Sequence, residues 1–149
     1  MEKTFTSGSR QHEYWQQPMD TGMLGCKLQS RARKYLNNHQ WQFAVRDYAA
    51  ALEVADTMLN EPESRSFAIE RYMRAALELI YAVRKHKPHT DLSVLIDTTQ
   101  KRLAPFFSPT PIELVTAPLV DLAFSPISDV DDWIHMLLSY EARGQPLPH

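Results

Sequence analysis

The sequence predicts a single all-helical (all-α) domain built from antiparallel helical hairpins. Apolar residues recur at intervals of three and four, which is the period of an amphipathic helix, and no stretch shows the alternation of a half-buried strand. Proline, glycine and asparagine interrupt this period where helices would end. With 149 residues, 44% of them hydrophobic, the chain is about one domain long and can bury a substantial core.

The first predicted hairpin covers residues 24–60 and follows a polar, aperiodic segment, residues 1–20, which we expect to be a flexible arm. The first helix is predicted from Leu24, and the tolerant turn residues 37–39 end it. Its apolar face consists of Leu24, Leu28, Ala32, Tyr35 and Leu36. The second helix, from Trp41 to about residue 59, has the clearest helical period in the chain.

A second hairpin is predicted over residues 66–104. Its first helix places Glu70, Arg74 and Glu78 at four-residue spacing, which predicts charge pairs on an outer face. Pro88 ends this helix, and Thr90 or Asp91 can cap the next one, which is expected to end at Pro105.

The remaining chain is acidic and is predicted to end in one well-marked helix. Residues 105–127 are rich in proline and indicate a connector, with one short helix capped by Thr110 and Glu113. The last helix is expected over residues 129–143 with Ser128 as its cap, and its apolar side consists of Val130, Trp133, Ile134, Leu137 and Tyr140. Such a side needs burial, so we expect this helix to cap the domain, either in its own chain or swapped into a second chain as a homodimer.

Composition and the termini exclude several classes of protein. The formal net charge of −2 gives no general attraction to nucleic acid or anionic membranes. Cys26 is the only cysteine, which excludes an intrachain disulfide or a multi-cysteine zinc site and fits a reducing compartment. The opening residues lack an apolar signal core, and no run is long and apolar enough to span a bilayer. We therefore expect a cytoplasmic protein that does not bind membranes.

No catalytic, metal or cofactor site is predicted. His86 and His89 are separated by Pro88, which breaks the helix that would point both imidazoles at one ion. Helix-end electrostatics explain the acidic residues around 129–132, since the loop lacks the glycine and further oxygens of a calcium site. The chain has neither a G-x-S-x-G elbow nor a glycine-rich phosphate loop. The expectation is a protein that is not an enzyme and that carries no cofactor.

The segment from Leu28 to Leu59 resembles one tetratricopeptide repeat. Ala44, Tyr48 and Ala51 match the small, aromatic and small positions of the repeat's second helix, with Ala32 as the small residue of the first. The chain is also similar to small bacterial proteins of this kind. The second hairpin departs from the pattern, with Val94, Thr98 and Lys101 at the corresponding places. The resemblance implies a groove, lined by the first helix of each hairpin, that binds a peptide or protein.

Four basic residues are the candidate partner-binding set: Lys27, Arg31, Lys34 and Arg71. They lie on the first helix of each predicted hairpin but outside its apolar face, where they could bind carboxylates or carbonyls of a peptide. The leading hypothesis is therefore an adaptor or chaperone-like protein. The alternative is a small helical regulator that binds nucleic acid through the same basic face.

Overall fold

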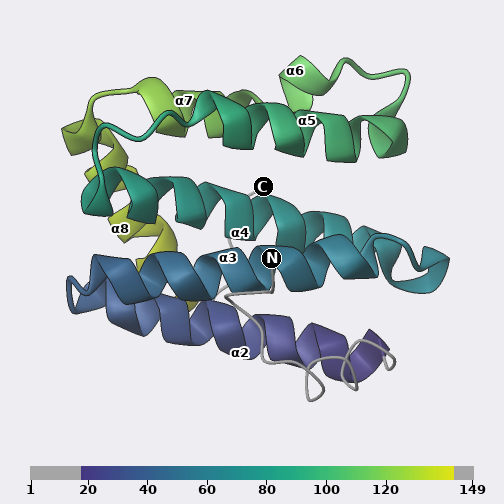
Figure 1. The fold of residues 1–149 in the computed structure, drawn as a ribbon, viewed down its shortest axis with the longest axis horizontal. Helices are drawn as coiled ribbons and strands as arrows, with labels where there is room; N and C mark the ends of the chain where they lie inside the picture. Colours follow the sequence, from purple (N-terminus) through teal and green to yellow (C-terminus); the bar gives the residue numbers. More distant parts are fainter. Residues whose placement is uncertain (1–17, 143–149) are drawn as a thin grey trace.

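The computed structural model describes residues 18–142, and this part of the chain contains helices and turns without a strand (Figure 1). The all-α prediction is confirmed. The longer helices are α2 (Pro18–Asn37), α3 (Trp41–Met58), α4 (Arg65–His86), α5 (Ser93–Phe107) and α8 (Ile127–Ala142). The shorter ones are η1 (Pro62–Ser64), α6 (Ile112–Val115) and α7 (Ala117–Phe124). None of the described helices combines the length and apolarity that a membrane-spanning segment needs.

Helix α2 begins at Pro18, six residues before the predicted start. The last three residues of the predicted arm are thus helical, while residues 1–17 lie outside the described part of the chain. Proline is tolerated in a first helical turn, and two glycines follow it. A Cβ at Gly25 would lie 3.3 Å from a methyl of Val54, and one at Gly22 would lie 3.2 Å from the Phe67 ring. Glycine, a poor helix former, therefore serves close packing against α3 and α4 here.

The turn between α2 and α3 is a Schellman motif. His39 adopts a left-handed conformation with φ of 60°, its amide donates to the Leu36 carbonyl at 3.0 Å, and the Gln40 amide donates to Tyr35 at 2.8 Å. The helix end expected at residues 37–39 is thus formed without a glycine. The turn directs α3 back along α2.

Small residues allow α2, α3 and α4 to pack closely side by side (Figure 1). Ala32 of α2 and Ala44 of α3 are completely buried, and Ala51 and Tyr48 are buried with them. Tyr35, expected in this core, is only half-buried. The alanines leave room for neighbouring backbones to approach, and the aromatic side chain of Tyr48 fills the remaining space.

The segment predicted as a proline-rich connector contributes to the core. Helix α5 continues through Pro105 to Phe107, because a proline in the last turn removes only one backbone hydrogen bond. The capping box expected at Thr110 does not form, and α6 begins after Pro111 without a side-chain cap. Helix α7 then packs against α4 and buries three apolar side chains: Leu119, Leu122 and Ala123.

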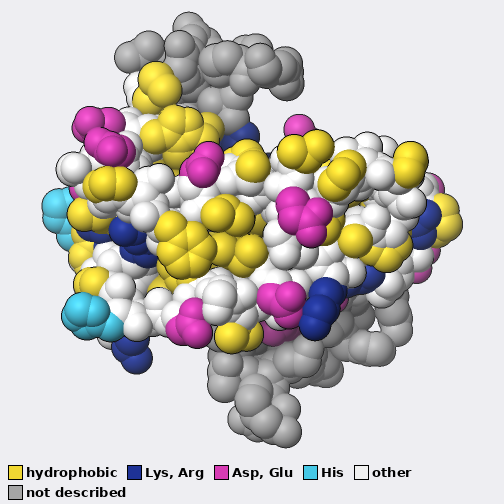
Figure 2. All heavy atoms as spheres, turned by 90° about the horizontal axis from the view of Figure 1, so that it is seen from above, with side chains coloured by type: hydrophobic (Ala, Val, Ile, Leu, Met, Phe, Trp, Pro, Cys, Tyr) yellow, Lys and Arg dark blue, Asp and Glu magenta, His cyan; other side chains and the backbone are white. Residues whose placement is uncertain are grey.

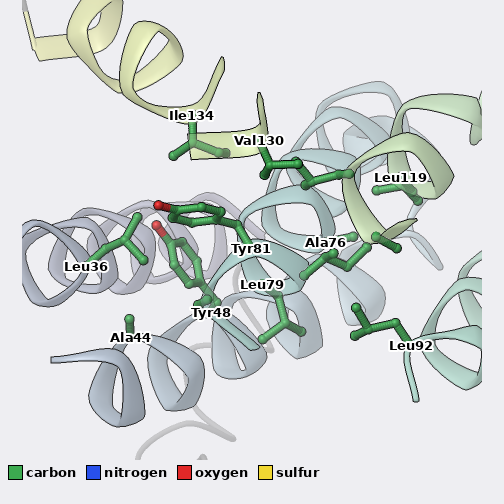
Figure 3. Close-up of a cluster of buried hydrophobic side chains, with 14 of the residues drawn as sticks. Leu36, Ala44, Tyr48, Ala76, Leu79, Tyr81, Leu92, Leu119, Val130 and Ile134 are labelled. Carbon is green, nitrogen blue, oxygen red and sulfur yellow. The ribbon is translucent and has the colours of Figure 1, made fainter. Parts of the chain in front are cut away.

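Helix α8 packs on its own chain (Figure 3). Val130, Ile134 and Leu138 are buried in one cluster with Leu36 and Tyr81. The helix begins at Ile127, so Ser128 lies inside it rather than capping it. The buried residues of α8 are spaced four apart, at 130, 134 and 138. Trp133, which was expected in the core, is 37% exposed. The predicted core position at Tyr140 lies outside the described side chains.

Candidate functional site

Three of the predicted partner-binding residues share one side of α2. Lys27, Arg31 and Lys34 are four and three residues apart, which places them in one exposed row. Arg31 also holds a structural ion pair. Its Nε and one terminal nitrogen donate to the two oxygens of Asp47 on α3, at 2.6 and 2.9 Å. The hydrogen bond with Asp47, a carboxylate that is only 2% exposed, raises the pKa of Arg31.

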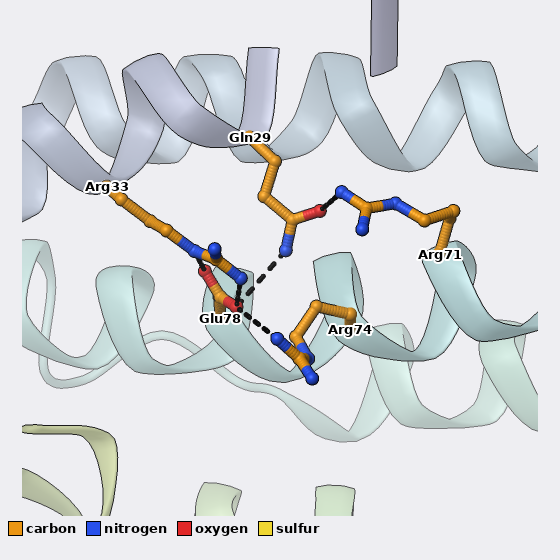
Figure 4. Close-up of polar contacts among 5 residues, drawn as sticks. All are labelled: Gln29, Arg33, Arg71, Arg74 and Glu78. Atoms are coloured by element: carbon orange, nitrogen blue, oxygen red, sulfur yellow. Dashed lines mark hydrogen bonds and ion pairs between the residues drawn. The ribbon is translucent and has the colours of Figure 1, made fainter. Parts of the chain in front are cut away.

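The fourth predicted residue, Arg71, lies elsewhere. It donates a hydrogen bond to the Gln29 side-chain oxygen, within a polar cluster between α2 and α4 (Figure 4). Gln29 projects from a different side of α2 than Lys27 and Arg31, because helical residues two positions apart are about 200° apart around the axis. The structure therefore does not bring the four predicted residues onto one surface.

Glu78 of α4 is the centre of this polar cluster, and it is completely buried. Its oxygens accept hydrogen bonds from Gln29 Nε2 at 3.1 Å and from Arg33 at 2.9 and 2.6 Å, and Arg74 lies 3.9 Å away. The predicted pair of Arg74 and Glu78 is present, but its placement on an outer face was wrong, because Glu78 is completely buried. Charged residues four positions apart share one side of a helix, and this spacing in the sequence is the same whether that side is buried or exposed.

The hydroxyl of Tyr48 adds a second buried polar group beside Glu78. It has no hydrogen-bond partner among the described residues, and burial, followed by the Glu78 charge, raises the pKa of Tyr48. Neither the Tyr48 hydroxyl nor the Glu78 carboxylate, which accepts hydrogen bonds from Arg33, is exposed to solvent. The cluster therefore links α2 to α4.

A smaller polar link joins α4 to α8. The Tyr81 hydroxyl donates to Asp131 at 2.6 Å, and Lys85 Nζ lies 3.3 Å from the same carboxylate. Burial opposes ionisation of Asp131, but the hydrogen bond from Tyr81 and the charges of Lys85 and His135 outweigh it and lower the pKa of Asp131. Beside this link lies a pocket of about 260 Å³ that also includes His39 and Trp41.

The Asp131 link gives a testable pH dependence. Asp131→Asn is expected to lower the free energy of unfolding by about 1 kcal/mol at neutral pH, because it weakens one charge-assisted hydrogen bond and one ion pair. A carboxyl whose pKa is lowered by folding stabilises the folded state above its ordinary pKa of about 4, and this contribution is lost in acid. Urea unfolding at several pH values should show that the wild-type protein and Asp131→Asn differ less in their free energy of unfolding as the pH falls. The exposed neighbour is the control, and Asp132→Asn should change stability by less than about 0.5 kcal/mol.

A groove of about 400 Å³ lies between α7 and α8. Its apolar lining consists of Pro118, Leu122, Val130 and Trp133. Its polar lining consists of Ser125 and one acidic residue from each helix, Asp121 and Asp129. Further large apolar side chains are exposed on α6, α7 and α8: Leu114, Val120, Phe124, Ile127 and Met136. Figure 2 views the molecule from the side of α5 to α7 and shows apolar side chains spread over this face, with acidic ones among them.

The sequence does not predict this groove, because the proline content of residues 105–127 indicates a connector. A signal was present in the segment Ala117–Phe124, in which every residue except Asp121 is apolar. A helix with apolar residues on all sides cannot bury them against one neighbour. Here α7 buries Leu119 and Leu122 against the core and leaves Phe124 64% exposed. A short helix that is apolar except for Asp121 is therefore the feature of the sequence that indicates exposed apolar surface in this segment.

The other candidate groups are not assembled into a site. Cys26 is half-buried in α2, and His89 is exposed in the turn after α4. Within residues 18–142, no group of three or more His, Cys, Asp and Glu residues is placed to hold a metal ion. No model of a known protein family matches the chain, and no curated protein and no solved structure is detectably similar to it.

Proposed function

We propose that this protein is a non-enzymatic interaction module, an adaptor or chaperone-like protein, that binds a peptide or protein partner in the groove between α7 and α8. The observation that carries the proposal is the groove of about 400 Å³, which Trp133 lines, together with the exposed apolar side chains of the helices that form it. Contiguous exposed apolar surface is costly in water and commonly marks an interaction site. Tryptophan is also enriched among the residues that dominate binding energy.

The resemblance to tetratricopeptide proteins supports the same class of function, because it implies a helical protein that binds peptides. It implies a different surface, however, the one lined by α2 and α4. Arg31 is engaged with Asp47 and Arg71 with Gln29 within the chain, so half of that predicted set already has internal partners. For this reason we assign the proposed groove to α7 and α8.

The alternative function, nucleic-acid binding, depends on the exposed basic row of α2, which consists of Lys27, Arg31 and Lys34. Asp47 offsets the charge of Arg31 there, so the row presents less positive charge than its sequence suggests. Duplex and single-stranded oligonucleotides of random sequence are expected to bind only weakly, with binding that falls steeply as salt is raised. Fluorescence anisotropy measures this directly. Sub-micromolar affinity at physiological salt, lost on reversing the charges of Arg31 and Lys34, would favour the regulator instead.

Peptide selection tests the proposed groove. A random peptide library displayed on phage would be selected in parallel on the wild-type protein and on Trp133→Ser. We expect the wild-type protein to enrich peptides whose affinity for Trp133→Ser is at least about tenfold lower, which corresponds to about 1.4 kcal/mol. The control is Met23→Ser, an exposed apolar residue of α2 that does not line the groove, and this change should leave binding unchanged. Enriched peptides that bind all three proteins equally would rule out the groove.

A further inference from the structure

We infer that the groove between α7 and α8 selects a basic partner segment, one that places a bulky apolar side chain in the groove and a lysine or arginine beside it. The inference rests on the proposed function and specifies the chemistry of the partner. It is carried by the distribution of charge around the groove and by the exposure of two carboxylates at its edge.

The segment that forms the groove is acidic and has no lysine or arginine of its own. From Leu103 to Ala142 the sequence has no lysine or arginine, and it has six acidic residues: Glu113, Asp121, Asp129, Asp131, Asp132 and Glu141. Two cations of α4 contact this segment, and among the described contacts neither pairs with Asp121 or Asp129. Arg84 donates to the Leu122 carbonyl at 2.8 Å, and Lys85 pairs with Asp131.

Two carboxylates remain at the groove itself. Asp121 of α7 and Asp129 of α8 line it from the two helices, and both are exposed. A purely apolar partner would cover these carboxylates without replacing the water that they lose, and leaving such groups unpaired costs free energy. An acidic partner would add repulsion to that cost. A lysine or arginine of the partner would restore a hydrogen-bonded ion pair, so the groove discriminates in favour of a basic segment.

The apolar lining accounts for the other half of the partner. Pro118, Leu122, Val130 and Trp133 together present a concave apolar surface, and a volume of about 400 Å³ is in the range of sites that bury a bulky group. A second copy of this chain fits less well. A symmetric contact would place each groove against its own copy, so that Asp121 and Asp129 would face acidic residues again.

The experiment compares peptides enriched on the full-length protein with charge variants of the groove. Enriched sequences are expected to share a large apolar residue within four positions of a lysine or arginine. Their synthetic versions should bind the double variant Asp121→Asn/Asp129→Asn at least about tenfold more weakly in calorimetry, and the affinity should fall as salt is raised. Asp97→Asn, an exposed change on α5, is the matched control and should leave binding unchanged.

The other outcomes separate this inference from the proposed function. Peptides that require Trp133 but lack basic residues, or that ignore the aspartate changes, would overturn the inference and leave the groove as a binding site. Failure to enrich any peptide that requires Trp133 would overturn both. A dimer in sedimentation that becomes monomeric in Trp133→Ser would identify a second copy as the occupant. Displacement of the peptides by synthetic segments 1–17 or 143–149 of this chain would identify an internal occupant. Either result would place the occupant in this protein itself and contradict a separate partner.

Discussion

Ala44→Glu is expected to abolish cooperative folding at room temperature. Ala44 lies in α3 where α2, α3 and α4 pack closely, and its side chain is completely buried. A glutamate there would bring both excess volume and a carboxylate without a partner into the core. Overpacking and an unpaired buried charge are each strongly destabilising, and together they should cost more than about 4 kcal/mol.

Circular dichroism during thermal and urea unfolding measures this effect, and Gln42→Glu is the matched control. Gln42 is exposed on the same helix, two residues earlier, so the same charge should change the free energy of unfolding by less than about 0.5 kcal/mol. If both variants melted like the wild-type protein, the core would not lie on the side of α3 that carries Ala44.

Glu78→Ala is expected to lower the free energy of unfolding by about 3 kcal/mol, because removing one partner of a buried ion pair leaves the other charge uncompensated. Glu78 is completely buried and accepts hydrogen bonds from Gln29 and Arg33, which join α4 to α2. Urea unfolding followed by fluorescence measures the change. The control, Glu70→Ala, removes an exposed glutamate from the same helix and should cost less than about 0.5 kcal/mol.

A double-mutant cycle isolates the Arg33 and Glu78 contact. Arg33→Ala combined with Glu78→Ala should cost less than the sum of the single changes by about 1–3 kcal/mol, because the second change removes a charge that the first left uncompensated. Additive costs would show that the two side chains do not interact in solution. A cost below about 1 kcal/mol for Glu78→Ala alone would contradict a structural role for the buried carboxylate.

The long helices could be predicted because their periods and end signals agree. Trp41 to Met58 combines a strong three-and-four period with a proline after its end, and Pro88 follows α4 in the same way. The start of α2 was missed because Gly22 and Gly25 are poor helix formers whose use, close approach to α3 and α4, is a tertiary property. On α8, Val130 and Ile134 are buried as predicted but Trp133 is not. The apolar residues cover two sides of this helix, and only the position of Leu36 and Tyr81 selects the buried stripe.

The candidate site was less predictable for the same physical reason. A basic residue outside an apolar stripe looks exposed in sequence, and Arg31 and Arg71 have that pattern although each binds a residue of this chain. Glu78 shows the converse, since a charged residue in a regular four-residue series is completely buried. The hydrogen-bond partners of these side chains lie 16 to 49 residues away, which no local pattern reveals.

The most direct test of the binding surface is a methyl NMR titration of the full-length protein with an enriched peptide. If the partner binds between α7 and α8, the resonances of Leu122 and Val130 should shift with the bound fraction, and those of Leu28 in α2 and Ile69 in α4 should not. Shifts centred on Leu28 and Ile69, with Leu122 and Val130 unchanged, would place the partner against α2 and α4 and contradict the assignment of the groove.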